Sequence, residues 1–200
     1  PYETFVENQG LVIRQDWLDE QGLALPTTYD QMFETLKTFR DAYGTSTAIY
    51  FNSDCNINGL TVGYDVAVFS AGGTATSLPY YAVDGVVHCS LIEDGYRDFL
   101  KEMNKWYNEG LFNKNFGSIA YDPMGGELAE LQANGTVGVW CTSGEGIGNI
   151  TQDVSCVPNL VQNEGDMDHQ TSTSLVTDST NTYVTSCCED VETAMKFLDY

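Results

Sequence analysis

The chain has 200 residues, of which 42% are hydrophobic, 12% aromatic and 18% charged, and this composition favours one folded globular domain over a disordered chain. Its 8 Lys and Arg residues stand against 29 Asp and Glu residues, which leaves a formal net charge of −21 at pH 7. A protein that binds DNA or RNA must neutralise phosphates with Lys and Arg, so this charge argues against a nucleic-acid partner and against an anionic membrane surface.

Lys and Arg are absent from a long stretch in the second half of the chain. No Lys or Arg stands between Lys114 and Lys196, whereas the same stretch contains many Asp and Glu residues. Two interpretations remain open. The acidic side chains form a solvated surface that keeps the protein soluble, or they line a cleft that prefers cationic or polyhydroxylated ligands.

The first predicted elements are a β-strand over residues 10–14 and an amphipathic helix. Thr28 can cap this helix, with Gln31 as the return partner of a capping box, and Gly44 supplies a left-handed stop. Apolar residues at three- and four-residue spacings predict its buried face: Tyr29, Met32, Phe33, Leu36, Phe39 and Tyr43.

The middle of the chain predicts a strand over residues 48–51, a loop-rich stretch over 52–87, and a second helix over 92–109. Asp84-Gly85 between two β-rich pairs predicts a two-residue hairpin turn. Gly110 is expected to end the second helix. Its apolar side is predicted from the following residues: Tyr96, Phe99, Leu100, Met103, Trp106 and Tyr107.

The last third predicts further alternation of helices and strands. Asp122-Pro123 is expected to open a third helix that ends at Asn134-Gly135. Strands are predicted over residues 136–140, 154–157 and 182–186, and a last helix over 189–199. The alternation predicts an α/β fold, a sheet covered by helices.

The sequence contains no recognisable catalytic or metal-binding set. His88 and His169 have no second ligand at a useful spacing. Glu164, Asp166 and Asp168 alternate as in the first part of a calcium loop, but the central Gly and the closing Glu are missing, so an acidic surface loop is expected. We therefore expect no cofactor, no bound metal and no enzymatic activity.

The six cysteines are too few for a disulfide scaffold. Cys141 and Cys156 stand in strand-like apolar contexts, so free buried thiols are expected there. The sequence contains no run of about 18 apolar residues, the length needed to span a bilayer, and residues 1–10 lack the pattern of a signal peptide. These features predict a processed protein or a piece of a longer one.

Four stretches of the chain carry a recognisable combination of motifs. Residues 11–30 combine a strand, an Arg-x-Asp-x-Leu helix and a Pro-Thr-Thr-Tyr-Asp cap. Residues 103–111, 131–139 and 183–200 follow, and together the four stretches resemble, in the same order, extracellular solute-binding proteins of ABC importers, family 1, the maltose-binding-like group. Residues 103–111 resemble the helix before the family's Gly-Leu-Ile-Asp-Pro, residues 131–139 its helix-turn-strand, and residues 183–200 its return strand and last helix. The resemblance implies a helix-flanked mixed sheet, one lobe of a type II periplasmic binding protein-like fold.

The resemblance also implies how the chain is organised. Residues 1–200 would be the second lobe of a two-lobe receptor, with crossover segments near 1–12 and 181–190. Within these segments, residues 5–10 and 181–186 are expected to lie side by side at one edge of the lobe. The first lobe of the same protein, which is missing here, would carry the secretion and lipid-attachment signals. The receptor is then expected to be an extracytoplasmic monomer, a cell-surface lipoprotein or a periplasmic protein, that partners ABC permease subunits.

Solutes of such receptors bind in the cleft between the lobes, and a carbohydrate or oligosaccharide is the expected ligand. A peptide or a cationic metabolite is the alternative, because the chain is acidic and Glu145 occupies the position of the Trp in the family's Asn-Gly-Pro-Trp turn. A secreted enzyme is the third possibility.

The resemblance places the best candidate site in the turn that contains Thr142, Ser143 and Glu145, with Trp140 either in the core or stacked on the ligand. Glu145 is interpreted either as a hydrogen-bond acceptor for the ligand or as a carboxylate that stabilises a helix start. The remaining candidates are aromatic or polar residues in loops: Phe69, Ser70, Tyr80, Tyr81, Tyr121 and Asp122.

Overall fold

The computed structural model describes residues 4–5, 10–51, 58–64, 66, 69–70, 77–78, 80–119, 126–142, 150–166, 175–176, 188 and 190–198. The chain forms two compact units, a larger one of residues 7–173 and a smaller one that combines residues 1–6 with 174–200. Among the residues just given, no helix is long and apolar enough to cross a membrane.

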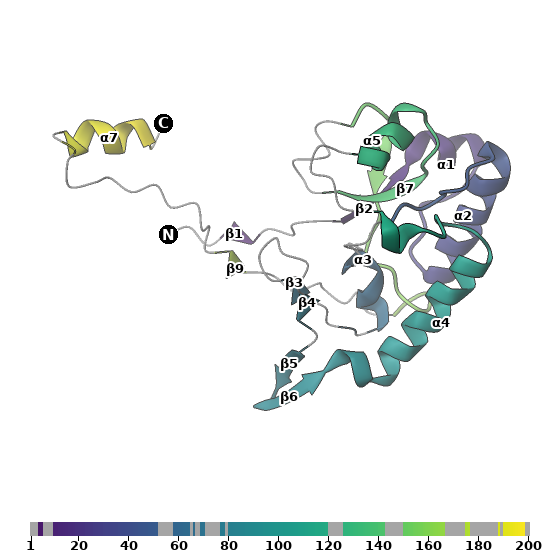
Figure 1. Ribbon diagram of the computed structural model, residues 1–200, viewed down its shortest axis with the longest axis horizontal. Helices are drawn as coiled ribbons and strands as arrows, with labels where there is room; N and C mark the ends of the chain where they lie inside the picture. The colour runs from purple at the N-terminus through teal and green to yellow at the C-terminus, as the bar shows by residue number, and fades with distance from the viewer. Residues whose placement is uncertain are drawn as a thin grey trace. The chain divides into compact units, whose positions relative to one another are not determined.

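The larger unit is built on a three-stranded antiparallel sheet. Its strands are β2 (Gly10–Arg14), β7 (Val139–Thr142) and β8 (Val154–Cys156), in the order β7-β2-β8 (Figure 1). Residues 48–50 run beside β7 but form a single parallel bridge, Ile49 with Val139, in place of the predicted strand. The reason is that this segment shares its hydrogen bonds with another loop, because the Ile49 amide donates to the Leu111 carbonyl.

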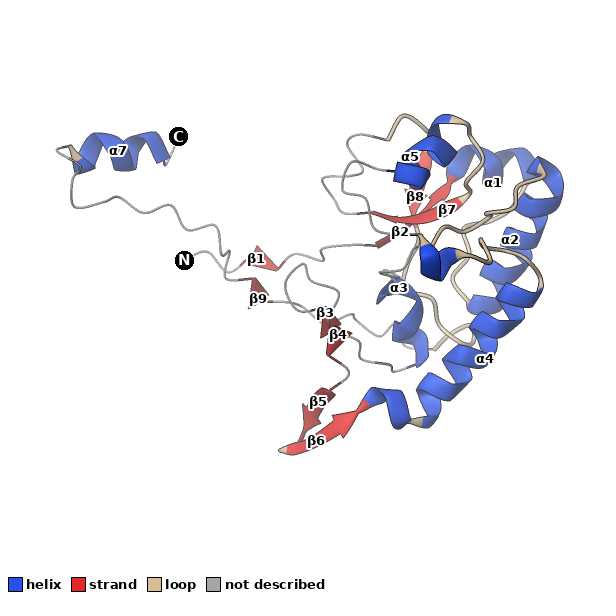
Figure 2. Ribbon diagram, viewed as in Figure 1, coloured by secondary structure: helices blue, strands red, loops and turns tan. Residues whose placement is uncertain are grey.

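Side chains of β2 alternate between two hydrophobic clusters, as expected for a strand that is covered on both faces. Leu11 and Ile13 belong to the main core, which also takes the buried faces of α1 (Gln15–Gln21), α2 (Tyr29–Tyr43) and α4 (Asp94–Asn108) (Figure 2). Val12 belongs to a smaller cluster that includes side chains of α5 (Gly126–Ala133). The sheet therefore has helices on both faces, which confirms the predicted α/β class.

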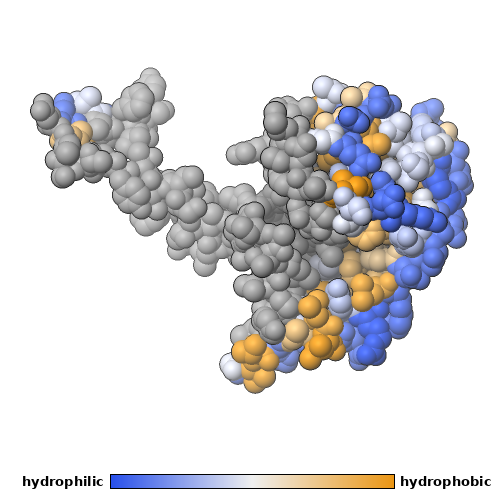
Figure 3. All heavy atoms as spheres, in the orientation of Figure 1, coloured by the Kyte–Doolittle hydropathy of each residue, from blue (hydrophilic) through white to orange (hydrophobic). Residues whose placement is uncertain are grey.

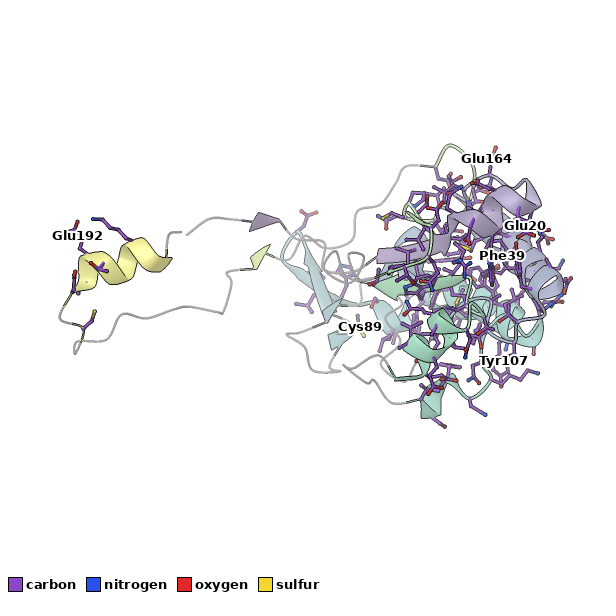
Figure 4. All side chains as sticks on the ribbon, turned by 90° about the horizontal axis from the view of Figure 1, so that it is seen from above. Glu20, Phe39, Cys89, Tyr107, Glu164 and Glu192 are labelled. Atoms are coloured by element: carbon purple, nitrogen blue, oxygen red, sulfur yellow. The ribbon has the colours of Figure 1, made fainter. Side chains whose placement is uncertain are left out.

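Helix α2 begins and ends where the sequence predicts. The Thr28 hydroxyl accepts a hydrogen bond from the Gln31 amide at 3.2 Å, and the Gln31 side chain accepts one from the Thr28 amide at 3.3 Å, so the capping box is complete. Gly44 ends the helix with φ at 62°. Phe39, on the inner face of the helix, lies among the core side chains (Figure 4).

The predicted hairpin is present between β5 (Tyr80–Val83) and β6 (Val86–Cys89). Asp84 and Gly85 have φ values of 52° and 78°, both left-handed as a type I′ turn requires. A short 3-10 helix, η2 (Ser90–Ile92), leads into α4. Apolar residues lie exposed along the hairpin and the 3-10 helix (Figure 3): Val86, Val87, Leu91 and Ile92.

Helix α4 confirms the second predicted helix, with one exception among the residues predicted to be buried. Phe99 and Trp106 are buried, and Met103 packs against the core from between them. Leu100 is 48% exposed, so its predicted place on the buried side was wrong. Residues 99, 103 and 106 set the direction of the buried stripe, and Leu100 is turned away from it by about 100°, the rotation per residue of an α-helix.

Helix α5 is described from Gly126, so its predicted start at Asp122-Pro123 lies outside the described residues. It ends at the predicted place, with φ of 65° at Gly135. Strand β7 begins three residues later than predicted, because the Thr136 amide bonds back to the helix carbonyl of Leu131 and the Gly138 amide bonds to Ala48. Strand β8 matches the prediction to within one residue.

The described part of the larger unit also includes three short pieces: α3 (Asn58–Thr61), followed by the 3-10 turn η1 (Val62–Tyr64); the two-stranded pair of β3 (Phe69–Ser70) and β4 (Ser77–Leu78); and the 3-10 turn η3 (Phe116–Ser118). In the smaller unit, β1 (Thr4–Phe5) pairs antiparallel with β9 (Leu175–Val176). Helix α7 (Val191–Leu198) confirms the last predicted helix. The predicted strand over residues 182–186 lies outside the described residues.

Candidate functional site

Several segments of the larger unit reach the same end of the central sheet, where β7 ends and β2 begins. The last residue of β7, Thr142, pairs with Gly10, the first residue of β2. Residues 49–51 run parallel to β7 toward the same edge, and the Tyr50 amide donates to the Val139 carbonyl at 2.9 Å. Phe51 is fixed there by edge-to-face packing against Phe112, with ring centroids 5.1 Å apart. We call this end of the sheet, formed by Gly10, Phe51 and Thr142, the β7 edge.

Tyr50 lies beside the first residues of β7 and carries a phenol. The side chain is half-buried against the smaller cluster around Val12 and Trp140. Burial raises the pKa of its hydroxyl, and the negative charge of Glu127 raises it further. The phenol therefore stays protonated at neutral pH and can donate a hydrogen bond.

Glu127 lies in the first turn of α5 and is held by Asn113. The Asn113 amide nitrogen donates to a Glu127 carboxylate oxygen at 3.3 Å, in a partly buried position. The carboxylate has further lone pairs, and the Asn113 side chain has an amide oxygen. Tyr50, Asn113 and Glu127, which we call the polar trio, thus offer both donors and acceptors, the combination that hydroxyl groups need.

Trp140 lies in the core. It is 1% exposed and packs between Val12 and the side chains of α5, so its ring is not available for stacking on a ligand. Its indole Nε1 has no hydrogen-bond partner among the residues that the structure describes. Trp106, which is equally buried, differs in this respect, since its Nε1 donates to Glu102 at 2.7 Å.

The predicted site residues are only partly described. Thr142 is half-buried at the end of β7, at the β7 edge. Ser143, Glu145, Tyr121 and Asp122 lie outside the described residues.

The other four candidates fall on strands away from the central sheet. Phe69 and Ser70 form β3, and Tyr80 and Tyr81 belong to β5. Both strands are parts of separate two-stranded sheets, so no ladder of backbone hydrogen bonds joins them to the β7 edge.

The sequence did not predict the polar trio. Tyr50 lies in a β-rich run, Asn113 in a connection and Glu127 in the first turn of a helix, and each is ordinary in its own segment. The only available signal was indirect. A strand over residues 48–51 was expected to enter a sheet, but its neighbours were not specified.

The cysteines and acidic residues supply no metal site in the part of the chain that is described. No group of three or more His, Cys, Asp or Glu side chains is close enough there to hold a metal ion. Cys141 is a free, half-buried cysteine, and burial raises the pKa of its thiol to about 12. Cys156 is exposed, so the prediction of a buried thiol was wrong, because it stands at the end of the outer strand β8.

The acidic loop that contains Glu164 and Asp166 is exposed, as predicted. The Asp166 carboxylate accepts hydrogen bonds from the backbone and the side-chain amide of Asn163, at 2.9 and 3.1 Å. Asp168 and His169 lie outside the described residues.

No family model matches the sequence, but solved structures have the same fold. An extracellular solute-binding protein from Bifidobacterium longum subsp. infantis matches 78% of this chain and 34% of its own, with a TM-score of 0.58 and 23% identity. The S. pneumoniae ABC-transporter substrate-binding protein FusA, in complex with kestose, matches 78% of this chain and 32% of its own, with a TM-score of 0.59 and 18% identity. The chain has the fold of ABC-transporter solute-binding proteins. The alginate-binding protein AlgQ2 matches 79% and 34%, with a TM-score of 0.57 and 19% identity.

Two curated relatives are similar in sequence. Lipoprotein LipO of Bacillus subtilis (strain 168) is 31% identical over 119 residues, 53% of this chain and 22% of the relative. The polygalacturonan/rhamnogalacturonan-binding protein YtcQ of the same organism is 26% identical over 160 residues, 75% of this chain and 28% of the relative. The chain therefore spans about a quarter of the length of these two relatives. The solute-binding fold implied by the sequence motifs is confirmed.

Proposed function

We propose that the chain is a ligand-binding lobe of an extracytoplasmic solute receptor that delivers a carbohydrate or oligosaccharide to an ABC importer. The observation that supports this most directly is the polar trio, in which the Asn113 amide donates to the Glu127 carboxylate and the charge of Glu127 raises the pKa of the Tyr50 phenol. Hydroxyl groups of sugars both donate and accept, so this set of side chains suits them. The fold shared with sugar-binding receptors supports the same assignment.

The proposal extends to the organisation of the receptor. Residues 1–200 form its second lobe, residues 1–12 and 181–190 are crossovers, and a first lobe of the same chain closes over the ligand. The partial coverage of the relatives supports this. The receptor is a monomeric cell-surface lipoprotein or periplasmic protein, docks on permease subunits, and has no enzymatic activity.

The proposed site also includes the turn after β7. Thr142 lies at the β7 edge, and Ser143 and Glu145 follow it directly in the chain. Tyr121 and Asp122 precede α5 in sequence and are proposed as further contacts.

The substitution Glu145→Gln discriminates between the two roles of the Glu145 carboxylate, a ligand contact and the stabilisation of a helix start. A ligand contact predicts a loss of about 10- to 150-fold in affinity, whereas unchanged affinity with a slightly lower Tm removes Glu145 from the site.

Isothermal titration calorimetry on the full-length receptor tests the function. The panel contains raffinose, stachyose, kestose, a set of short peptides, and the polyamine spermidine. Binding of at least one sugar and of no peptide or polyamine is the expected result. Tight binding of peptides or spermidine alone would replace the proposal with the alternative receptor, which the net charge of −21 favours. Turnover of any compound in the panel would instead indicate a secreted enzyme.

A further inference from the structure

The hairpin of β5 and β6 exposes apolar side chains at its tip. Val86 is 58% exposed and Val87 is 72% exposed, although successive residues of a strand point to opposite faces. Both faces of the tip are therefore apolar and in contact with water. In the described part of the chain, β5 and β6 pair only with each other. An isolated two-stranded hairpin is at best marginally stable in water, so contact with a partner would stabilise this one.

The 3-10 helix η2 extends this apolar surface. Leu91 is 46% exposed and Ile92 is 82% exposed, and η2 follows β6 directly in the chain. Figure 3 shows apolar surface over the hairpin and η2, beside the hydrophilic outer face of α4. We call Val86, Val87, Leu91 and Ile92 the hairpin patch. Exposed apolar patches with polar surroundings mark interaction sites, so the hairpin patch is a surface for a partner.

The charged residues next to the hairpin patch are mostly acidic. Residues 84–97 contain one guanidinium, that of Arg97, against three carboxylates: Asp84, Glu93 and Asp94. The Arg97 guanidinium lies 3.1 Å from the Asp94 carboxylate, so its charge is already balanced there. Asp84 is exposed in the turn at the tip of the hairpin. A partner that covers the tip therefore has to supply a positive charge.

These charges disfavour two of the possible partners. A second copy of the chain has the same net charge of −21, and its Lys and Arg side chains on α2 and α4 each lie within 4.0 Å of a carboxylate already. An anionic membrane surface would repel Asp84 and its acidic neighbours. The shape of the hairpin adds a further argument. A flat surface covers only one face of a hairpin, whereas a groove covers both.

We propose that the hairpin patch inserts into an apolar groove on the extracytoplasmic face of the permease, where Lys or Arg side chains of the permease surround Asp84. This inference rests on the proposed function, which gives the receptor a permease to meet, and it adds the surface through which this lobe docks. The apolar side chains stabilise the complex because they leave water. The charge of Asp84 orients the hairpin in the groove.

Removal of exposed apolar side chains tests the docking surface. The double variant Val87→Ser with Ile92→Ser changes no buried residue, so the full-length receptor should fold and bind sugars as before. Its affinity for the permease complex, held in phosphatidylcholine nanodiscs and titrated with fluorescently labelled receptor, should fall about tenfold or more. The matched control, Leu25→Ser with Val191→Ser, removes two exposed apolar side chains from other segments and should dock normally. Equal affinities of the two double variants would overturn the inference.

A charge-neutral variant tests the positive groove. Asp84 has a left-handed backbone with φ of 52°, which Asn also adopts readily, so Asp84→Asn removes the charge and keeps the turn. Docking should weaken several-fold and depend less on salt concentration. Asp19→Asn, which removes an exposed carboxylate from α1, is the control and should change neither property. An Asp84→Asn receptor that docks as the control does would refute a positive groove around the tip.

Two further measurements identify the other partners. Binding to protein-free vesicles of phosphatidylglycerol and phosphatidylcholine that the serine double variant abolishes would assign the hairpin patch to a membrane surface. A dimer in sedimentation velocity that the same variant dissociates would assign it to a second copy. Either result would replace the permease as the occupant. Docking that no variant changes contradicts this inference alone, whereas the absence of docking together with no binding of raffinose, stachyose or kestose contradicts the proposed function as well.

Discussion

The Arg14 guanidinium forms two parallel hydrogen bonds with the Asp16 carboxylate, Nε to Oδ1 at 2.7 Å and Nη2 to Oδ2 at 2.5 Å. Arg14 is only 9% exposed, and its Cζ lies 4.8 Å from the centroid of the Trp17 ring. The Asp16 side chain is 42% exposed. One partner of this pair is thus buried at the end of β2, and its charge is balanced by a carboxylate that remains in contact with water.

Removal of Asp16 should destabilise the larger unit. Asp16→Asn leaves the buried guanidinium without its counter-charge, and we expect a loss of about 1–2 kcal/mol, less than for a fully buried pair because water screens the exposed carboxylate. Urea titration measures this loss. Asp19→Asn, on the same short helix but exposed, serves as the control and should change stability by no more than about 0.5 kcal/mol.

The same pair predicts a pH dependence. The hydrogen bonds from Arg14 hold the pKa of Asp16 below its ordinary value. A lowered folded-state pKa means that this contribution to stability is present above the unfolded pKa, about 3.9, and is lost as the pH falls through the folded value. The difference in unfolding free energy between the unmodified protein and Asp16→Asn should therefore shrink below about pH 4. A difference that stays constant in acid would contradict the assignment.

Gly138 permits the close approach of three segments. A Cβ atom at this position would lie 2.6 Å from Cδ2 of Phe39, 3.0 Å from the Ala48 carbonyl oxygen and 3.1 Å from Trp17. Because these neighbours belong to the packed core, Gly138→Ala should cost about 1–3 kcal/mol or more. Gly117→Ala is the control, since nothing lies within 4 Å of its Cβ. Equal Tm values for the two variants would refute this packing argument.

Features that depend on neighbouring residues in the chain were predictable, whereas features that join distant segments were not. The Thr28–Gln31 cap and the Asp84-Gly85 turn follow from local backbone chemistry, so both were predicted correctly. The electrostatic influence of Glu127 on Tyr50 depends on how residues 48–51 dock beside β7, which no local pattern specifies. The sequence shows directly that residues 115–195 contain no Lys or Arg. It did not predict that the Lys and Arg side chains of α2 and α4 form ion pairs there.

The capping box of α2 predicts how much the Thr28 hydroxyl contributes to the stability of the protein. Thr28→Ala removes the acceptor of the Gln31 amide and should lower stability by about 1 kcal/mol. Thr28→Ser keeps the acceptor and should recover most of the loss. Thermal unfolding of the three proteins checks both expectations. A serine variant as unstable as the alanine variant would assign the effect to the threonine methyl group.

Two cysteines should differ sharply in reactivity. Cys141 is half-buried and burial raises the pKa of its thiol to about 12, whereas Cys156 is exposed. Only the thiolate attacks iodoacetamide, so at pH 8 Cys156 should be modified much faster than Cys141 in the folded protein. Peptide mass mapping over time identifies each site. In urea the two rates should converge, and comparable rates in the folded protein would contradict the described burial of Cys141.

The proposed two-lobe organisation predicts that the 200-residue chain alone binds its sugar weakly. A closed cleft buries most of a ligand between two surfaces, and under this proposal the polar trio would supply hydrogen bonds from one side only. Loss of the other lobe removes its hydrogen bonds and leaves the bound sugar open to water, so affinity should fall by about tenfold or more relative to the full-length receptor. Calorimetry of both proteins with the same neutral oligosaccharide measures the ratio. Equal affinities would place the complete site within this chain, and the first lobe would then have no direct part in binding.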